Sequence, residues 1–254
     1  MKPSRLRPSM LLDAHSPSAV RERLSSPPPQ SYLRDLVYGA IDGIVTTFAV
    51  VAGSAGAGFR PAIAIVLGFA NLLADGFSMA VSNFSASRAE RQEHAQARQE
   101  EQRQIREFPE GEREEIRQIF AAKGFEGEDL ERVVSKITSD IHLWVDTMMV
   151  EELGFGRELR DPLRAALTTF GAFLVAGFVP LIVFVYQAVT GTTFSEPFLM
   201  SAIATGVAFF SVGAMKSRFV AQSWWRAGLE TFALGGAAAS LAFIVGSLLQ
   251  TVAG

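Results

Sequence analysis

The sequence predicts an all-α membrane protein with five transmembrane helices. Three stretches, at about 36–84, 165–215 and 228–253, are nearly free of charged residues. Each contains windows of roughly 20 apolar residues, the length that crosses a bilayer as a helix. Charged residues make up only 19% of the chain, against roughly 25% in soluble domains. Core helices of soluble proteins rarely run this long without a charge, so these stretches indicate membrane spans.

Two of the apolar stretches are too long for one span, and each divides at a turn signal. The first breaks at "GSAGAGFRP" and the second at "TGTTFSEP", where Gly and Pro interrupt helices. Pro180 should kink the third span. The five spans are therefore expected at about 36–57, 62–84, 165–189, 197–215 and 229–252.

Lys and Arg residues near the span ends predict the orientation in the membrane. Residues 1–35 form a basic, Pro/Ser-rich tail that we expect to be disordered. The loop between spans four and five is also basic, whereas the loop after span one has only Arg60 and "TGTTFSEP" has no basic residue. The tail, the segment 85–164 and the loop 216–228 should therefore be cytoplasmic, and the C-terminus should face outward.

The segment 85–164, between spans two and three, has a different composition. It holds 19 of the 26 acidic and 13 of the 23 basic residues, a net charge of −6. We expect three helices: the first continues span two to Pro109, the second ends at Gly124, and the third runs from about Glu128 to Leu153. A cytoplasmic segment beside anionic lipid would gain from positive charge. Its acidity suggests that the carboxylates have another partner.

Several functional classes lack their signatures. Cysteine is absent, so disulfides and thiolate metal sites are impossible. The chain has no phosphate-binding G-x-x-x-x-G-K-[ST] loop and no H-E-x-x-H zinc motif. ATP-driven pumping and zinc proteolysis are therefore unsupported, and we expect neither a prosthetic group nor a nucleic-acid partner.

Asp42 is the first candidate functional residue, because it lies within span one. Intramembrane carboxylates usually face a cavity or a partner; the alternative is that Asp42 lies near the headgroups and is simply hydrated. Gly39 and Gly43 have the G-x-x-x-G spacing that permits close helix approach. This spacing would let two copies of span one meet and bring two Asp42 side chains together.

Span two carries a polar stripe at helical spacing. A thioether beside carboxylates is a plausible site for a borderline transition metal, although Met can also be a filler and the polar groups can simply join helices. The stripe comprises Asn71, Asp75, Ser78, Met79 and Ser82.

The insert offers a second group of ligands, from carboxylates on its helices and two thioethers near its end. These side chains could bind several Fe(II)-like ions, or they could be a solvated acidic surface with two core Met residues. His94 and His142 lack the Glu-x-x-His spacing of di-iron sites and are expected to be surface or packing residues. The candidate ligands are Glu101, Glu112, Glu115, Met148, Met149 and Glu152.

The sequence resembles the vacuolar iron transporter family, in a bacterial version. The resemblance covers about residues 32–253 and is carried, in order, by "DLVYGAIDGIVTTFAVVAGSAGA", "LLADGFSMAVSNFSASRAER", "EFPEGEREEIRQIF" and "WVDTMMVEELG". It implies a homodimer of five-span protomers, with an ion path between the subunits lined by spans one and two. The family exports Fe(II), and in some members Mn(II), from the cytosol in exchange for protons.

The resemblance also assigns roles to individual residues. Asp42 matches the family's pore aspartate and Met79 its pore methionine. Together with Asn71, Asp75 and Asn83, they make up the expected transport pathway. The insert matches the family's cytoplasmic metal-binding domain. Its acidic pair after the Pro corresponds to Glu112 and Glu115, its Met-Met and Glu cluster to Met148, Met149 and Glu152, and its first-helix acid to Glu101.

The sequence departs from the family at three positions. Relatives commonly read G-E-Y after the S-M motif, where this chain has Ser82-Asn83-Phe84 and lacks the pore-mouth carboxylate. Asp75 stands where they usually have a small residue. One turn beyond Glu101, where the family often has a second acid, this chain has Gln104. These changes bear on metal preference and on the number of bound ions.

The leading hypothesis is a proton-coupled Fe(II)/Mn(II) efflux transporter of the bacterial inner membrane, not an enzyme. The first alternative is a membrane-anchored ferroxidase or iron-storage protein, which the acidic insert favours and the missing Glu-x-x-His motif opposes. The second is a metal-sensing membrane protein without transport.

Overall fold

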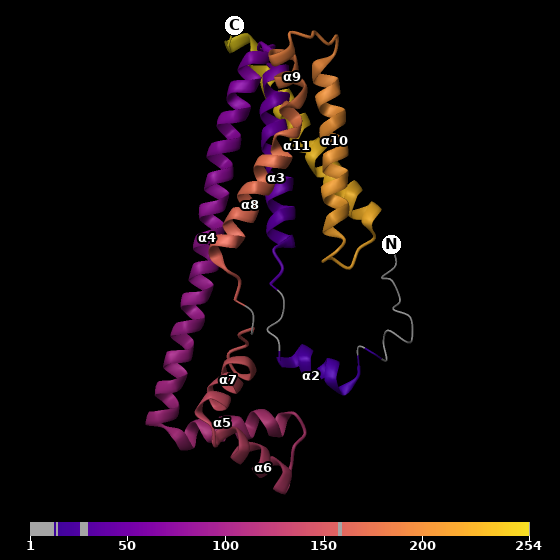
Figure 1. Cartoon of the computed structure of the whole chain (residues 1–254). Coiled ribbons are helices and arrows are strands. Elements are labelled where there is room, and N and C mark those ends of the chain that lie inside the picture. The colour runs from indigo at the N-terminus through magenta and orange to yellow at the C-terminus, as the bar shows by residue number, and fades with distance from the viewer. Residues whose placement is uncertain (1–12, 14, 26–29, 157–158, 254) are drawn as a thin grey trace. The chain divides into compact units, whose positions relative to one another are not determined.

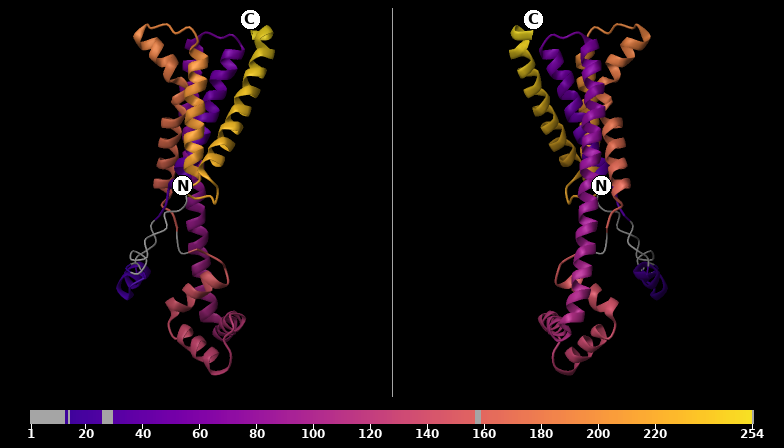
Figure 2. Two further views of the ribbon diagram at one scale, coloured as in Figure 1. Left: turned by 90° about the vertical axis from the view of Figure 1, so that its right-hand side faces the viewer. Right: turned by 90° about the vertical axis from the view of Figure 1, so that its left-hand side faces the viewer.

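The computed structural model describes residues 13, 15–25, 30–156 and 159–253, and within them it is helical without any strand. The chain divides into two compact units, one formed by residues 1–84 and 162–254 and the other by residues 85–161. The sequence predicts an insert at 85–164, close to this second unit. The helices are drawn in Figures 1 and 2.

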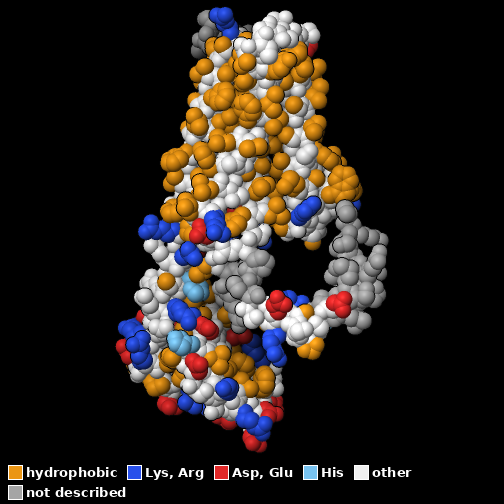
Figure 3. Space-filling view, in the orientation of Figure 1, with side chains coloured by type: hydrophobic (Ala, Val, Ile, Leu, Met, Phe, Trp, Pro, Cys, Tyr) orange, Lys and Arg blue, Asp and Glu red, His pale blue; other side chains and the backbone are white. Residues whose placement is uncertain are grey.

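The first unit contains the long apolar helices. Among the described residues, five helices are long and apolar enough to cross a membrane, as the sequence predicts. Their apolar side chains cover much of the face that Figure 3 shows. They are α3 (Leu33–Gly56), α4 (Pro61–Glu107), α8 with η1 and α9 (Pro162–Thr190), α10 (Pro197–Lys216) and α11 (Trp224–Ala253).

Helix α3 is the central element of this unit. It contacts α8, α10 and α11, and Val37, Ile44 and Val51 are at most 1% exposed. Its buried residues join Phe173 of α8 and Phe209 of α10 in one hydrophobic core. A helix that is apolar and covered on several sides is the expected centre of a bundle.

Gly39 and Gly43 pack against α8 of the same chain, which corrects the prediction that they bring two copies of span one together. A Cβ atom at Gly39 would collide with the backbone of Thr169, and one at Gly43 with the backbone of Phe173. The glycines therefore serve close approach of α3 and α8 within the protomer, which is the usual role of small residues between membrane helices.

The third span is interrupted at Pro180, as the sequence predicts. Helix α8 (Pro162–Gly177) is followed by the 3₁₀ turn η1 (Val179–Leu181), and α9 (Ile182–Thr190) continues the span. Proline removes a helical donor and clashes with the preceding turn. Within this interruption, the Pro180 carbonyl accepts a hydrogen bond from the buried Ser201 hydroxyl of α10, at 2.6 Å.

The second unit is a small helical domain with its own core. It comprises residues 85–107 of α4, then α5 (Pro109–Ala122), α6 (Gly127–Thr138) and α7 (Ile141–Glu151). Its core is built on Ile116, Val134, Val145 and Met148, each at most 1% exposed. Pro109 begins α5, and Gly124 follows it with φ of +93°, as expected for chain breakers.

The predicted third helix of the insert, from Glu128 to Leu153, is in fact two helices. The chain leaves the helix after Thr138, and the side chain of Asp140 caps α7 by accepting hydrogen bonds from the backbone N–H groups of His142 and Leu143. Asp is a strong N-cap residue because its oxygen satisfies donors that the helix leaves free. Ile141, the first residue of α7, is 41% exposed.

The N-terminal region contains helix α2 (Pro17–Ser25), within the tail that the sequence predicts to be disordered. Helix α2 has no buried residue. Residues 1–12, 14 and 26–29 of the predicted tail lie outside the described residues.

Candidate functional site

Asp42 lies in the middle of α3 and is half-buried. One turn later, the Thr46 hydroxyl donates to the backbone carbonyl of Asp42 at 3.0 Å. Asp42 is also close enough to Asp75 of α4 for their charges to interact. The structure thus brings together the two carboxylates that the sequence placed in neighbouring spans.

Asn71 of α4 forms hydrogen bonds to α3 one turn from Asp42. Its side-chain amide donates to the Thr46 hydroxyl at 3.1 Å and reaches the Thr47 hydroxyl at 3.5 Å. Thr46 and Thr47 do not figure among the sequence-predicted residues. Both follow Asp42 by about one helical turn, which is the only sequence signal that could have pointed to them.

The predicted polar stripe of α4 divides into two parts in the structure. Asn71 and Met79 are half-buried, and Met79 packs against the central hydrophobic core. Asp75, Ser78 and Ser82 are exposed on the uncovered side of α4. Leu73 and Phe77 are also exposed, at 60% and 64%, but each is two residues from Asp75 and so lies on the other flank of α4.

Asn83 belongs to a buried polar cluster that joins three helices. Its amide donates to Asp35 of α3 at 3.0 Å and to Thr169 of α8 at 2.7 Å. Asp35 is 6% exposed and Thr169 is 2% exposed. Sequence reasoning missed Asp35, which precedes Asp42 by seven residues and therefore lies on the same face of α3, two turns away.

The second unit holds two buried carboxyl groups that face each other. Glu101 is 3% exposed and Glu112 is 6% exposed. When one of the two carboxyl groups is protonated, it can donate a hydrogen bond to the other. Without that proton, Glu101 Oε1 and Glu112 Oε2 are buried acceptors with no donor, which is costly for charged groups.

Burial and mutual repulsion raise the pKa values of this acidic cluster. Burial, followed by Glu112, Glu152 and Glu115, raises the pKa of Glu101 to about 8. The pKa of Glu112 is raised by burial and by Glu115, and that of Glu152 by burial, Glu115 and Glu112. The four predicted carboxylates therefore lie within electrostatic range of one another.

Met148 and Met149 lie in the core beside this cluster. They are 0% and 2% exposed, and the backbone N–H of Glu152 donates to the Met148 carbonyl at 3.0 Å. One turn before Met148, the indole Nε1–H of Trp144 is buried without an acceptor, a feature that sequence reasoning missed. Carboxylate oxygens with thioether sulfurs would suit a borderline transition metal.

The acidic cluster around Glu101 does not form a complete set of metal ligands in this conformation. Among the described residues, no three His, Asp or Glu side chains converge closely enough to hold a metal ion. Glu115 and Glu152 are exposed, so a cation at Glu101 and Glu112 would require these side chains to turn inward. His94 packs edge-on against Phe155 with ring centroids 5.4 Å apart, and His142 is exposed.

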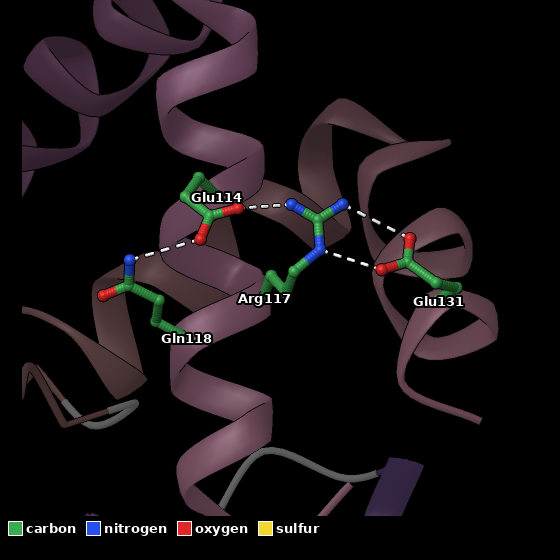
Figure 4. A network of polar contacts seen from close by, with 4 residues as sticks. All are labelled: Glu114, Arg117, Gln118 and Glu131. Carbon is green, nitrogen blue, oxygen red and sulfur yellow. Dashed lines mark hydrogen bonds and ion pairs between the residues drawn. The ribbon is translucent and has the colours of Figure 1, made fainter. Parts of the chain in front are cut away.

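On the opposite face of α5, acidic side chains are paired with an arginine. Arg117 pairs with Glu114 and reaches Glu131 of α6 through Nε at 2.8 Å, and Gln118 donates to Glu114 at 3.2 Å (Figure 4). Arg117 lowers the pKa values of Glu114 and Glu131. Helix α5 thus separates acids balanced by arginine from the acidic cluster around Glu101.

Comparison with known proteins gives relatives of similar length. The chain is 34% identical over 229 residues to the vacuolar iron transporter of Toxoplasma gondii, covering 88% of this chain and 76% of the relative. It is 30% identical over 221 residues to vacuolar iron transporter 1 of Arabidopsis thaliana, covering 86% of each chain. The vacuolar iron transporter of Plasmodium berghei is 29% identical over 231 residues, covering 89% of this chain and 85% of the relative.

The match extends from the first residues of α3 into the last helix, and so includes both the paired carboxylates of α3 and α4 and the acidic cluster of the second unit. Residues 33–247 fit the sequence profile of a single family. The protein belongs to the VIT family.

Proposed function

We propose that the protein exports Fe(II), and also Mn(II), from the cytosol in exchange for protons. Its relatives are named vacuolar iron transporters, and five of the described helices are long and apolar enough to span a membrane. The transported ion is the substrate, and the proposal requires no prosthetic group. Translocation needs no covalent chemistry, so the protein is not expected to be an enzyme.

The observation that carries the proposal is the buried Glu101–Glu112 pair, in the unit whose core also contains Met148 and Met149. Two buried carboxyl groups, for which no ion pair is found among the described residues, must hold a proton or a cation between them. The pair can therefore exchange a proton for a divalent ion, and a thioether of the same unit that reached the ion would favour a transition metal over Mg²⁺ or Ca²⁺. The second unit would collect the ion before transport.

The proposed pathway runs along α3 and α4. Asp42 and Asp75 supply charge, Met79 supplies a thioether, and Asn71 fixes the hydroxyls beside Asp42. Where relatives carry a pore-mouth carboxylate, this chain has Asn83, which holds the Asp35 carboxylate at 3.0 Å. Asp35 would restore the missing negative charge from the neighbouring helix.

Exposure of Asp75 supports a homodimer with the pathway at its interface. Asp75 lies on the uncovered side of α4, and a charged side chain facing lipid is costly. A second copy packed on this side would shield Asp75 and place two sets of Asp42, Asp75 and Met79 around one path. The glycines of α3 do not form this interface, because they pack on α8.

We place the protein in a bacterial inner membrane, with the N-terminus and the second unit in the cytoplasm. The excess of Lys and Arg in the N-terminal region and in the loop after α10 supports this orientation. The ion would then enter from the acidic cytoplasmic unit and leave on the opposite side.

The test is Fe(II) uptake into proteoliposomes that contain the full-length protein, under an imposed pH gradient. We expect uptake to follow the gradient and to be lost in Asp42→Asn, whose shape matches but whose carboxylate is gone. Met79→Ala should weaken Fe(II) uptake at least severalfold. Ser240→Ala, at an exposed position on α11, is the matched control and should retain uptake.

Two alternative functions predict different results. A ferroxidase would consume oxygen when Fe(II) is added and would not respond to the pH gradient. A sensor would bind Fe(II) without moving it across the membrane. Gradient-independent uptake, or uptake unchanged in Asp42→Asn, would contradict the proposed coupling.

A further inference from the structure

The end of α10, the loop after it and the start of α11 border a hollow that the proposed transport does not use. The hollow has a volume of about 860 Å³. Its lining is mixed, with the polar Ser217, Arg218, Gln222 and Ser223 beside the apolar Met215, Val220 and Trp224. Figures 1 and 2 show α10 and α11 converging on this loop. The surface offers several hydrogen-bond donors and one guanidinium group to a ligand.

Arg218 is the cation that this hollow leaves available. Nearby Lys216 pairs with Glu230 at 3.4 Å, and the guanidinium of Arg226 lies over the Trp225 ring, 5.1 Å from its centroid. Within the part of the chain that the structure describes, the Arg218 side chain has neither an ion-pair nor a hydrogen-bond partner. The planar guanidinium fork suits a phosphate group.

An apolar groove begins where the hollow ends. It has a volume of about 560 Å³, lies between α10 and α11, and is lined only by apolar residues, including Ala202, Val207 and Phe232. Phe210 lines the groove and Trp224 lines the hollow, and their rings meet edge to face at 5.9 Å. The hollow and the apolar groove are therefore adjacent, with this pair of rings between them.

We propose that this surface binds an anionic phospholipid, with its phosphate at Arg218 and one acyl chain in the groove between α10 and α11. The order of the two parts matches that of a lipid, with a charged head followed by an apolar chain. Trp224 and Trp225, 48% and 45% exposed, are residues that favour the headgroup level of a bilayer. The proposal does not depend on metal transport.

The occupant is expected to be a lipid for reasons of charge and placement. The lining of the hollow includes Arg218 and no acid, and Glu230, which accepts from the lining residue Gln222, is also paired with Lys216, so the open site is positive. A second copy of the chain would have to bring an acidic group to meet Arg218. The proposed contact between two copies is at Asp75 of α4 and not at this hollow.

The test uses fluorescence quenching by brominated lipids in nanodiscs. The chain has three tryptophans, so Trp144→Phe with Trp225→Phe leaves Trp224 as the only emitter in the full-length protein. Phosphatidylglycerol and phosphatidylcholine, each brominated near the glycerol end of the acyl chain, are compared at equal mole fractions. We expect half-maximal quenching at about a fivefold lower mole fraction of the anionic lipid.

Two variants separate a built site from general charge attraction. Arg218→Gln should abolish the preference for phosphatidylglycerol. Arg226→Gln, which removes an equal charge from the first turn of α11 but does not line the hollow, should keep it. Ala202→Phe, which fills the groove, should weaken quenching while the protein remains monodisperse. Added inorganic phosphate should not relieve the quenching.

Several outcomes would overturn the proposal. Equal quenching by the two lipids would show an ordinary lipid-facing surface. Equal losses in Arg218→Gln and Arg226→Gln would show attraction by net charge alone. Relief of quenching by inorganic phosphate would assign the hollow to the free anion, and insensitivity to Ala202→Phe would remove the acyl chain from the groove.

Discussion

At the scale of single residues, the Glu101–Glu112 pair buries two carboxyl groups together, where their negative charges would repel. With a pKa of about 8, Glu101 keeps its proton at neutral pH. Because this pKa is raised above the ordinary value, the stability that Glu101 contributes is complete below about pH 4.5 and is lost as the pH rises through about 8. Without a cation, the second unit is therefore expected to have a lower free energy of unfolding at alkaline pH.

Metal binding by this unit should strengthen as the pH rises. A cation at Glu101 and Glu112 must displace the proton between them, so affinity should rise up to about tenfold per pH unit between pH 6.5 and 8. Titration calorimetry of the full-length protein with Mn(II) measures this dependence. Glu101→Gln should reduce affinity by more than about tenfold, and Glu114→Gln, on the arginine-paired face, should change it little. Affinity independent of pH would exclude proton exchange at the pair.

Asn83 should stabilise the first unit through Asp35 and Thr169. Asn83→Ala removes two donated hydrogen bonds from buried acceptors, and we expect a loss of about 1.5–3 kcal/mol. Thermal unfolding of the detergent-solubilised protein gives the comparison. Ser82→Ala, one residue away and exposed, serves as the control, and equal losses in the two variants would show that the Asn83 cluster contributes nothing specific.

The carboxylates at this scale were only partly predictable from sequence. Asp42 is conspicuous because apolar residues flank it over several turns on both sides. Asp35 lies in the first turn of α3, where a carboxylate usually meets water and headgroups. Its burial depends on Asn83 and Thr169, which are distant in sequence, so only the seven-residue spacing to Asp42 pointed to it.

At the scale of helices, hydropathy and chain breakers located the spans. The sequence did not show which helices pack against each other. The sequence indicates that Gly39 and Gly43 permit close approach but does not identify the approaching helix, which is α8. The division between α6 and α7 was missed because the apolar periodicity continues through it. The signal was Asp140, an N-cap residue that stops one helix and starts the next.

Gly43→Val tests whether α3 meets α8 or another copy of α3. The added side chain would strike the Phe173 backbone, and such overpacking costs about 1–3 kcal/mol. We expect lower thermal stability with an unchanged oligomeric state, measured by unfolding and by size-exclusion chromatography with light scattering. Gly53→Ala, where the nearest atom is 3.5 Å from the new Cβ, should be tolerated. Dissociation of an oligomer without loss of stability would contradict packing on α8.

At the scale of the whole molecule, the flank of α4 that carries the exposed carboxylate of Asp75 is the proposed contact between copies. The chain has no cysteine, so a single introduced thiol reports on such contacts. Ser78→Cys, at an exposed position on this flank, should form a disulfide-linked dimer in native membranes, and Val207→Cys, at a position 63% exposed on α10, should not. Gel electrophoresis without reductant distinguishes them. Cross-linking only through Val207→Cys would move the interface to the other side of the protein.

The broken third span also has a consequence for how this sequence can change over evolution. Pro180 leaves a carbonyl outside the helical pattern, and the hydroxyl of Ser201 on the next helix satisfies it. Replacing Ser201 alone by Ala leaves that carbonyl without this donor. Exchanging Pro180 for a residue with an N–H restores a donor to the carbonyl four residues earlier and removes the clash that interrupts the span. Only once the helix then closes can an N–H one turn later bond the carbonyl of residue 180 and release Ser201 from selection. The two positions, separated by 21 residues, should therefore be inherited together and lost in a fixed order.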